Sequence, residues 1–435
     1  MFNALFTKTD EYARLAQALG GPGACALFGI PGSGRAMVYA ALAKALDKPL
    51  CIVTPGEAEA TRFAGDLNAL GVAAAVFPAR DYVLRPIEGT GREYEYRRLA
   101  VLGDLVGGRL QAVCVPDEGL TQYTTPRADF CANTRSLRPG DTLPRSELTA
   151  LLYGAGYTRR DQVDGPGQFS IRGDIADIYA PDMKQPARME FWGDEIDTMH
   201  TFDLATQRRD EPIEKIYVSP AREILFGQPA DAAEKIRSYI KKARGRRRPA
   251  LETCTAADLA QLDGGAMPVN MDKYLTLRYP EPATILDYFD DPLLILEEPA
   301  SLREAERATA FRRGEELSAL LEDGVLAAGL DKLYAESGWL WAQCAAYRTL
   351  CAENFARSMP DVPLKTIVNA PAHTLPAWGG EVAALLEDIQ PLCSGGTAVT
   401  VMAGTPRAAA GLAADLRTKG YELSLNWRDE FQLLR

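Results

Sequence analysis

The chain has 435 residues, of which 47% are hydrophobic and 25% charged, and its formal net charge is −11. This length suits roughly two to four domains with sizeable cores, and the acidic balance disfavours a protein that coats nucleic acid with its whole surface. The chain has no run of about 20 apolar residues, and its first residues do not form a secretory signal. We therefore expect a cytoplasmic protein with no membrane partner.

Cysteine and histidine usage argues against metal sites and histidine triads. The eight cysteines are widely spaced and form no C-x-x-C pair, and His200 and His373 are the two histidines of the chain. Zinc sites need closely spaced ligands, and a Ser-His-Asp site needs a suitably placed histidine. We expect buried free thiols and no metal site.

The first part of the chain, to about residue 120, alternates between short apolar runs and helical patterns. Strands are predicted at residues 24–30, 49–55, 72–79 and 111–116, and helices at 35–46, 57–71 and 95–108. This alternation is typical of a doubly wound, mainly parallel sheet of the kind found in nucleotide-binding folds.

A glycine-rich turn joins the first predicted strand to the first helix. It nearly matches G-x-x-x-x-G-K-[ST], with Gly29, Gly32 and Gly34 present but Arg35 and Ala36 at the lysine and hydroxyl positions. Alanine cannot ligate Mg²⁺, and arginine replaces a compact charge with a planar fork. We interpret the stretch as a degenerate nucleotide loop that has kept its turn geometry and lost hydrolysis.

ATP hydrolysis would also need an acidic motif after an apolar strand, and two stretches resemble one. Asp117 and Glu118 follow a predicted strand, but a proline intervenes and a solvated turn is the favoured interpretation. Glu297 and Glu298 follow a better apolar run, although glutamate stands where a metal-bridging aspartate is expected. We interpret the second pair as a degenerate acidic motif.

The hydrophobic period changes between about residues 136 and 223. A leucine-striped helix at 146–156 is followed by short alternating segments at 168–174, 175–181, 187–196 and 214–220. Such alternation predicts an antiparallel sheet packed on a helix. Because a helical pattern resumes at 231–243, we expect this sheet to be inserted into the first domain. Helices then dominate to about residue 358, with one strand at 292–299, and β/α alternation returns in the last residues.

The inserted segment carries a dense series of recognisable motifs between residues 157 and 208. The matching positions are Tyr157, Val163, Gly167, Phe169, Arg172, Gly173, Asp177, Arg188, Phe191, Asp194 to Asp197, Phe202, Asp203, Gln207 and Arg208. In this order they resemble the domain shared by the excision-repair protein UvrB and the bacterial transcription-repair coupling factors. The incomplete nucleotide loop, the short segment 81–98 and the lack of a second helicase half make the chain more similar to the N-terminal region of the coupling factors.

The resemblance implies an α/β fold in four parts. These are a RecA/helicase-like parallel-sheet domain with the degenerate P-loop (1–123), an inserted antiparallel α+β domain that binds UvrA (124–222), a mainly helical continuation of the first domain (223–357) and a small α/β domain (358–435). It implies an adaptor without a cofactor that recruits UvrA to stalled RNA polymerase. In the family, ATP, magnesium, RNA polymerase and DNA engage later regions that this chain lacks, and the C-terminal domain covers the UvrA-binding face. We expect the chain to be part of a longer protein.

Alternation in the inserted sheet places a set of side chains on its outward face. Arg188, Glu190 and Trp192 alternate with inward apolar residues, and Ser170 and Arg172 are expected to point the same way. The resemblance implies that the two arginines and the tryptophan bind UvrA. The alternatives are a solvated Arg188–Glu190 pair and a tryptophan packed under a neighbouring domain.

A basic run lies just after the inserted segment. It comprises Lys241, Lys242, Arg244, Arg246, Arg247 and Arg248. Such a run can contact DNA phosphates, but without interleaved aromatic residues a solvated connector is the favoured interpretation. Two rival functions therefore stay open beside the adaptor: a UvrB-like ATPase acting on damaged DNA, and a DNA-binding module that uses this run.

Overall fold

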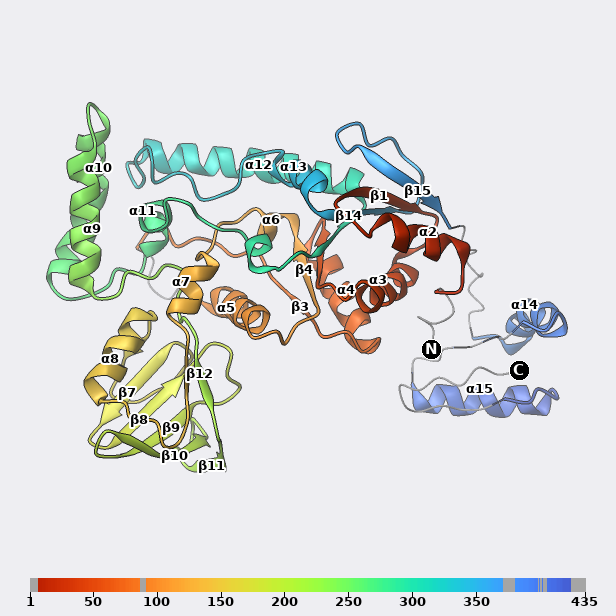
Figure 1. The fold of residues 1–435 in the computed structure, drawn as a ribbon, viewed down its shortest axis with the longest axis horizontal. Helices are drawn as coiled ribbons and strands as arrows, with labels where there is room; N and C mark the ends of the chain where they lie inside the picture. Colours follow the sequence, from red (N-terminus) through yellow and green to blue (C-terminus); the bar gives the residue numbers. More distant parts are fainter. Residues whose placement is uncertain are drawn as a thin grey trace.

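The computed structural model describes residues 7–86, 91–370, 380–397, 399, 401 and 405–423. The described chain forms a seven-stranded sheet with helices on both faces, a six-stranded sheet, a helical hairpin and a terminal helix pair. In Figure 1 the seven-stranded sheet lies in the middle, with the hairpin and the six-stranded sheet on the left and the terminal helix pair on the right. The predicted α/β class with a separate antiparallel unit is confirmed. No helix in these ranges is both long enough and apolar enough to cross a membrane.

The seven-stranded sheet takes its strands from two distant parts of the chain. Its order is β15–β1–β14–β13–β2–β4–β3, and every pairing is parallel. The strands are β1 (Gly23–Phe28), β2 (Leu50–Thr54), β3 (Ala74–Val76), β4 (Ala112–Pro116), β13 (Leu293–Glu297), β14 (Arg348–Glu353) and β15 (Leu364–Asn369). The central strands are buried along their whole length, as expected for a parallel sheet covered on both faces.

The sequence did not predict β14 or β15, and β15 changes the expected domain organisation. Because β15 pairs with β1, the parallel sheet extends past residue 358, where the sequence placed the start of the last domain. Alternate residues of β15, Lys365, Ile367 and Asn369, are exposed, and the strand lies at the edge of the sheet.

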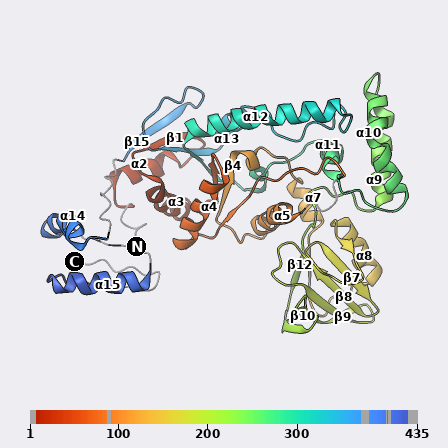
Figure 2. The ribbon, with the colours of Figure 1, turned by 180° about the vertical axis from the view of Figure 1, so that it is seen from behind.

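Helices cover both faces of this sheet. One face is covered by α2 (Asp10–Ala18), α3 (Gly32–Leu46) and α4 (Glu57–Ala69). The other is covered by α5 (Glu93–Val106), α6 (Asp117–Leu120), α7 (Arg127–Ala132), α12 (Pro299–Glu322) and α13 (Trp339–Ala346). Seen from behind, α12 runs along the length of the molecule above the sheet (Figure 2).

The six-stranded sheet lies apart from the parallel sheet and is covered on one face by α8 (Arg145–Gly154) (Figure 1). Its order is β11–β10–β9–β8–β7–β6, with all pairings antiparallel except that of β6 with β7. The strands are β6 (Thr158–Arg159), β7 (Gln168–Arg172), β8 (Ile175–Tyr179), β9 (Ala187–Trp192), β10 (Glu195–Phe202) and β11 (Arg209–Pro212). The strand predicted at 214–220 is β12 (Ile216–Val218), which pairs instead with β5 (Arg135–Leu137).

Two further helical parts complete the described chain. A hairpin of α9 (Pro229–Lys242) and α10 (Arg247–Asp263) packs on η1 (Met271–Tyr274) and α11 (Leu275–Arg278), and η2 (Ile285–Tyr288) leads into β13. Near the C-terminus, α14 (Val382–Ser394) and α15 (Pro406–Thr418) share a small apolar core. In the C-terminal β/α alternation, most of the strand expected at 397–403 lies outside the described residues, and residues 421–423, where a further strand was expected to begin, are not part of a strand.

All eight cysteines are free thiols, in agreement with the sequence prediction. Five of them are buried, but Cys131 and Cys393 are exposed and Cys254 is half-buried. The expectation of uniformly buried thiols is therefore wrong for these three positions, which lie on helices at the surface rather than on the strands of the parallel sheet.

A buried ionic cluster joins the inserted unit to the parallel-sheet domain. The carboxylate of Glu223, where the inserted segment ends, contacts Arg98 of α5 at 2.7 Å and Arg80 at 3.1 Å. Arg80 also contacts Asp272 of η1 at 2.7 Å, and the backbone N–H of Glu223 donates to Glu95. Each buried charge has a partner, so removal of any one of them would leave another buried charge unpaired.

Replacement of Glu223 by Gln should therefore lower the free energy of unfolding by about 3–5 kcal/mol, because Arg98 and Arg80 would lose the carboxylate with which both form ion pairs. Urea unfolding measures this change. The matched control is Glu234→Gln on the exposed side of α9, for which we expect a change within about 0.5 kcal/mol. Equal effects of the two substitutions would contradict the role of the cluster.

Candidate partner-binding site and glycine-rich loop

The face of the six-stranded sheet opposite α8 carries the predicted binding residues. Cross-strand pairing defines two rows on this outer face: Ser170, Asp177, Arg188 and His200 in one, and Arg172, Ile175, Glu190 and Thr198 in the other. Trp192, two residues beyond Glu190 on β9, lies on the same face and is paired with Glu195 of β10. The alternation predicted from the sequence thus holds for the two arginines and the tryptophan, since residues paired across strands share a face.

Asp177 binds both arginines at the centre of the outer face. Its buried carboxylate accepts two hydrogen bonds from Arg188, at 2.6 Å and 2.9 Å, and one from Arg172 at 2.9 Å. Arg188 also donates to the backbone oxygen of Gln207 at 3.2 Å and lies over the ring of Phe202. Hydrogen bonding to Asp177 raises the pKa of Arg188, so this arginine remains charged and fixed in position.

The two arginines therefore differ in how much of each is available to a partner. Only 13% of the Arg188 side chain is exposed, whereas 51% of the Arg172 side chain is exposed and its one hydrogen bond leaves further donors facing solvent. The expectation that both arginines point freely outward is wrong for Arg188. The alternative pair of Arg188 with Glu190 is also wrong, because Glu190 contacts Arg209 instead.

Ser170 also departs from its predicted environment. It lies on the outer face, but it is buried and its hydroxyl donates to the backbone oxygen of Asp161 at 2.8 Å. The chain before β7 therefore covers this end of the outer face, which alternation alone could not indicate.

Trp192 is the most exposed large apolar side chain of the described residues, at 83%. It ends β9 immediately before Gly193, whose positive φ of 64° turns the chain into β10. The backbone N–H of Phe191 donates to Asp174, so the turn that follows Arg172 lies beside Trp192. The alternative of a tryptophan packed under a neighbouring domain is wrong within the described structure.

The residues that position the arginines were not predicted as site residues from the sequence. Asp177 and Gln207 belong to the motif series, but no role was assigned to them. The signal for Asp177 was present: it is an acidic residue at an outward position of the strand that pairs with β9. Gln207 lies in a turn with a positive φ of 58°, for which periodicity gives no signal.

The glycines of the Gly29–Ala36 loop allow close backbone packing. Gly29 has a φ of +89°, and a Cβ atom there would lie 2.9 Å from the backbone oxygen of Ala370. A Cβ atom at Gly32 would lie 2.6 Å from the guanidinium of Arg62. The turn is therefore enclosed by β15 and α4, and the helix that it starts, α3, runs on from Gly32.

Arg35 brings together the two motifs that the sequence suggested separately. Its buried guanidinium contacts Glu297 at 2.9 Å and Glu298 at 2.8 Å, and it donates to the backbone oxygen of Ala352 at 3.0 Å. Ala36 is buried beside it in the apolar core under α3. The arginine thus places its positive charge directly on the acidic pair at the end of β13.

The electrostatics of this cluster depend on burial. Desolvation raises the pKa of Glu297 to about 7, although Arg35 and the hydrogen bond from the Tyr39 hydroxyl favour its charged form. Burial likewise raises the pKa of Tyr39, which remains a neutral donor. The cluster is a buried internal ion pair, with the side chains of Arg35 and Glu297 almost inaccessible to solvent.

Asp117 and Glu118 do not form the solvated turn that was expected. Asp117 is buried at the start of α6, and desolvation raises its pKa to about 7. Glu118 contacts Arg312 of α12 at 2.6 Å. The expectation is wrong because α12 packs over the end of β4, an arrangement that local sequence cannot indicate.

The basic run lies at the connection between α9 and α10. Lys241, Lys242, Arg244 and Arg246 are exposed, and no acidic partner is found for them in the described ranges. Arg247 lies over Tyr239, and Arg248 contacts Glu252 at 2.9 Å. The run therefore presents a cluster of cations at the end of the hairpin that points away from the two sheets (Figure 1).

Comparison with known proteins shows which family this chain resembles. Residues 136–224 match the model of the UvrB interaction domain. The chain is 30% identical over 308 residues to the transcription-repair-coupling factor of Bacillus subtilis, covering 68% of this chain and 26% of that protein. The coupling factor of Mycobacterium tuberculosis is 32% identical over 302 residues, covering 66% and 24%. That of Staphylococcus haemolyticus is 25% identical over 257 residues, covering 57% and 22%.

The chain spans about a quarter of the length of these curated relatives. The matches confirm the resemblance to the UvrB-like region of the coupling factors that the motifs of the inserted segment indicated. The matched domain contains the whole outer face, including Arg172, Arg188 and Trp192.

Replacement of Arg35 by Met tests the internal ion pair. It leaves Glu297 and Glu298 without their cation, so we expect a loss of about 3 kcal/mol or more of unfolding free energy at pH 8. The pKa of Glu297 is already raised from its ordinary 4.5, and loss of Arg35 raises it further. A raised pKa in the folded state favours folding at low pH and loses this contribution as pH rises, so the deficit should be smaller at pH 5.

Urea unfolding at the two pH values measures the deficit. The double variant Arg35→Met with Glu297→Gln should recover part of the loss, since it no longer buries an unpaired carboxylate at position 297. A deficit that is the same at both pH values would contradict the assignment.

Proposed function

We propose that this chain is the UvrA-recruiting adaptor part of a transcription-repair coupling factor, acting in nucleotide excision repair at stalled RNA polymerase. The observation that carries the proposal is the exposed Trp192 beside Arg172, on an outer face that lies within the matched UvrB interaction domain. An exposed indole next to an arginine with free donors has the composition of an interface hot spot.

The three residues have different roles in this proposal. Trp192 supplies apolar area, and Arg172 supplies charge-assisted hydrogen bonds to an acidic group of UvrA. Arg188 is a positioning residue, because its guanidinium is held by Asp177 and Gln207 and in turn fixes the carboxylate that orients Arg172.

The proposed adaptor function implies further partners besides UvrA. We assign RNA polymerase, DNA, ATP and magnesium to the regions that the relatives have beyond the matched part, and we propose a cytoplasmic location. A C-terminal domain of the longer protein would cover the outer face when UvrA is not bound. Without such a cover, the exposed indole of Trp192 would form nonspecific contacts with other proteins.

The glycine-rich loop fits an adaptor better than an ATPase. The guanidinium of Arg35 lies on the carboxylates that would otherwise approach a metal ion, and Ala36 supplies no hydroxyl. We propose that the internal ion pair takes over the stabilising role of a bound nucleotide, so that this chain needs no cofactor.

DNA binding through the basic run is the second candidate function. It is favoured by the four exposed cations at the free end of the α9–α10 hairpin. Such contacts would be weak and steeply dependent on salt on a chain with a net charge of −11.

The UvrA surface is tested by substitution of its exposed residues. Arg172→Ala and Trp192→Ala should each weaken UvrA binding by about 2 kcal/mol or more, measured by isothermal titration calorimetry, while the fold is unchanged. Arg172→Lys should restore little, because an ammonium group cannot reproduce the planar fork. Arg138→Ala, at an exposed position outside the outer face, is the control and should bind as the parent does. Unchanged affinity in the Arg172→Ala, Trp192→Ala double variant would place the interface elsewhere.

The rival ATPase is tested by steady-state phosphate release with and without DNA. We expect no turnover, because neither a lysine nor a metal-ligating hydroxyl is present at positions 35 and 36. A steady-state turnover that DNA stimulates would overturn the adaptor and favour the enzyme.

A further inference from the structure

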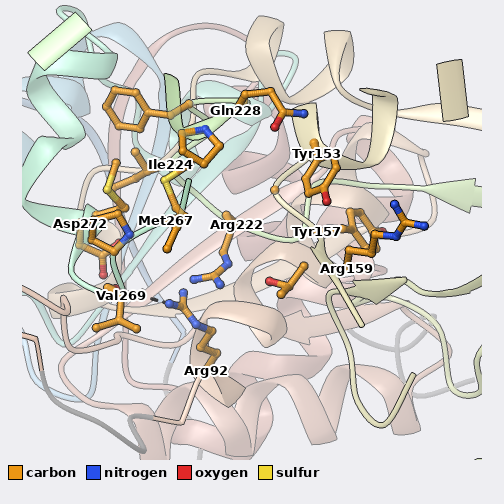
Figure 3. A pocket seen from close by; sticks show the side chains of 18 of the residues that line it. Arg92, Tyr153, Tyr157, Arg159, Arg222, Ile224, Gln228, Met267, Val269 and Asp272 are labelled. Atoms are coloured by element: carbon orange, nitrogen blue, oxygen red, sulfur yellow. Dashed lines mark hydrogen bonds between the residues drawn. The ribbon is translucent and has the colours of Figure 1, made fainter. Parts of the chain in front are cut away.

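A pocket of about 380 Å³ lies where the inserted unit meets the parallel-sheet domain and the base of the helical hairpin. Its wall combines the start of α5, the α8–β6 connection, the segment 222–229 and the loop 265–269 (Figure 3). This volume falls in the range of ligand sites, roughly 300–1,000 Å³, which occur preferentially between domains. The pocket is separate from the outer face that carries Trp192, since no outer-face residue lines it.

The absence of a side chain at Gly156 allows Arg222 to pack closely against the backbone of the pocket wall. A Cβ atom at Gly156 would lie 2.7 Å from Cγ of Arg222, and Gly156 has a φ of +83° that other residues rarely adopt. The aliphatic stem of Arg222 thus packs directly on the backbone at position 156. Its guanidinium lies in the pocket (Figure 3), and among the described residues it has no hydrogen-bond or ion-pair partner.

The charges around the pocket leave a positive excess. Its two acidic residues are already matched, Glu95 by Arg92 at 2.9 Å and Asp272 by Arg80 at 2.7 Å outside the pocket. Arg222 and the exposed Arg159 have no acidic partner in the described ranges. A half-buried guanidinium without a counter-charge is costly, so an anionic group on a ligand would complete this site.

The rest of the wall is apolar and continues onto the surface. Ile224 and Phe226 form part of the wall, while Met267 and Val269 are 39% and 45% exposed at its edge. A ligand would therefore bury an apolar group beside its anionic group. The exposed apolar edge extends the contact beyond the cavity, which favours a segment of polypeptide over a small molecule.

The aromatic residues argue against a nucleotide. Tyr157 is buried and donates its hydroxyl to Ser219, and Tyr153 packs edge-on against Phe169 with ring centroids 5.4 Å apart. Phe226, the third aromatic residue of the wall, is also buried and packs edge-on against Tyr274 with ring centroids 6.3 Å apart. The three rings are thus engaged in packing within the chain rather than arranged as a stacking platform for a base.

We propose that this pocket binds an acidic and apolar peptide segment of a partner protein. A carboxylate of the segment pairs with Arg222, and a neighbouring aliphatic side chain packs on Met267 and Val269. The site is independent of the UvrA surface and of its test.

The proposal is tested by methyl NMR of the full chain labelled at methionine, because Met267 and Met271 line the pocket. The probes are an acetylated Leu-Glu-Leu-Glu-Leu peptide amide, the same peptide with Gln for Glu, and inorganic phosphate. We expect the glutamate peptide to shift the Met267 signal, with at least tenfold weaker binding of the glutamine peptide and of phosphate. Arg222→Gln should weaken the glutamate peptide about tenfold or more, whereas Arg138→Gln, with the same charge change outside the pocket, should not.

Three results would overturn the proposal. Equal binding of both peptides would show that charge plays no part, equal binding of phosphate would make this a simple anion site, and no shift at Met267 would leave the pocket without this ligand. The signals of the other methionines, such as Met359 in the core of the parallel-sheet domain, report whether Arg222→Gln remains folded. If it does not, Met267→Gln at the exposed edge is the second variant, and unchanged binding of the glutamate peptide to it would also overturn the proposal.

Discussion

The arrangement of the molecule depends on the buried carboxylate of Glu223. It lies where the chain returns from the inserted unit, and it holds two arginines that come from the parallel-sheet domain. Because an unpaired charge at this depth costs several kcal/mol, against about 5–15 kcal/mol for the stability of a whole domain, the junction admits few alternative geometries. The outer face and the pocket both lie on parts of the chain whose position follows from this junction.

Arg35 forms a second buried ion pair that connects distant segments of the chain. The glycine-rich turn before α3 and the acidic end of β13 lie next to each other. Here a side chain of the loop itself reaches the acidic pair. This ion pair connects the first β–α turn of the parallel sheet to β13, which with β14 and β15 completes the sheet from residue 293 onward, far along the chain from β1.

The sequence predicted those features whose signal is local. Apolar runs identified five strands of the parallel sheet, and alternation identified the outward positions of β9. Contacts between distant segments left no such signal. β11 is exposed at every position and therefore shows no alternation, β15 joins the sheet only as an edge, and Asp117 is buried by a helix almost 200 residues away. Arg188 was placed on the correct face, but its engagement with Asp177 depends on the pairing of β8 with β9.

Arg172 and Arg188 show why a position on the surface is not the same as availability to a partner. Both arise from the same alternation and both contact Asp177, yet one is fixed by Gln207 and Phe202 while the other keeps free donors. The fixed arginine orients the carboxylate, and the carboxylate orients the free arginine. Substitution of Arg172 or Trp192 should therefore cost the fold little, whereas a change at Asp177 or Arg188 would alter both the surface and the residues that support it.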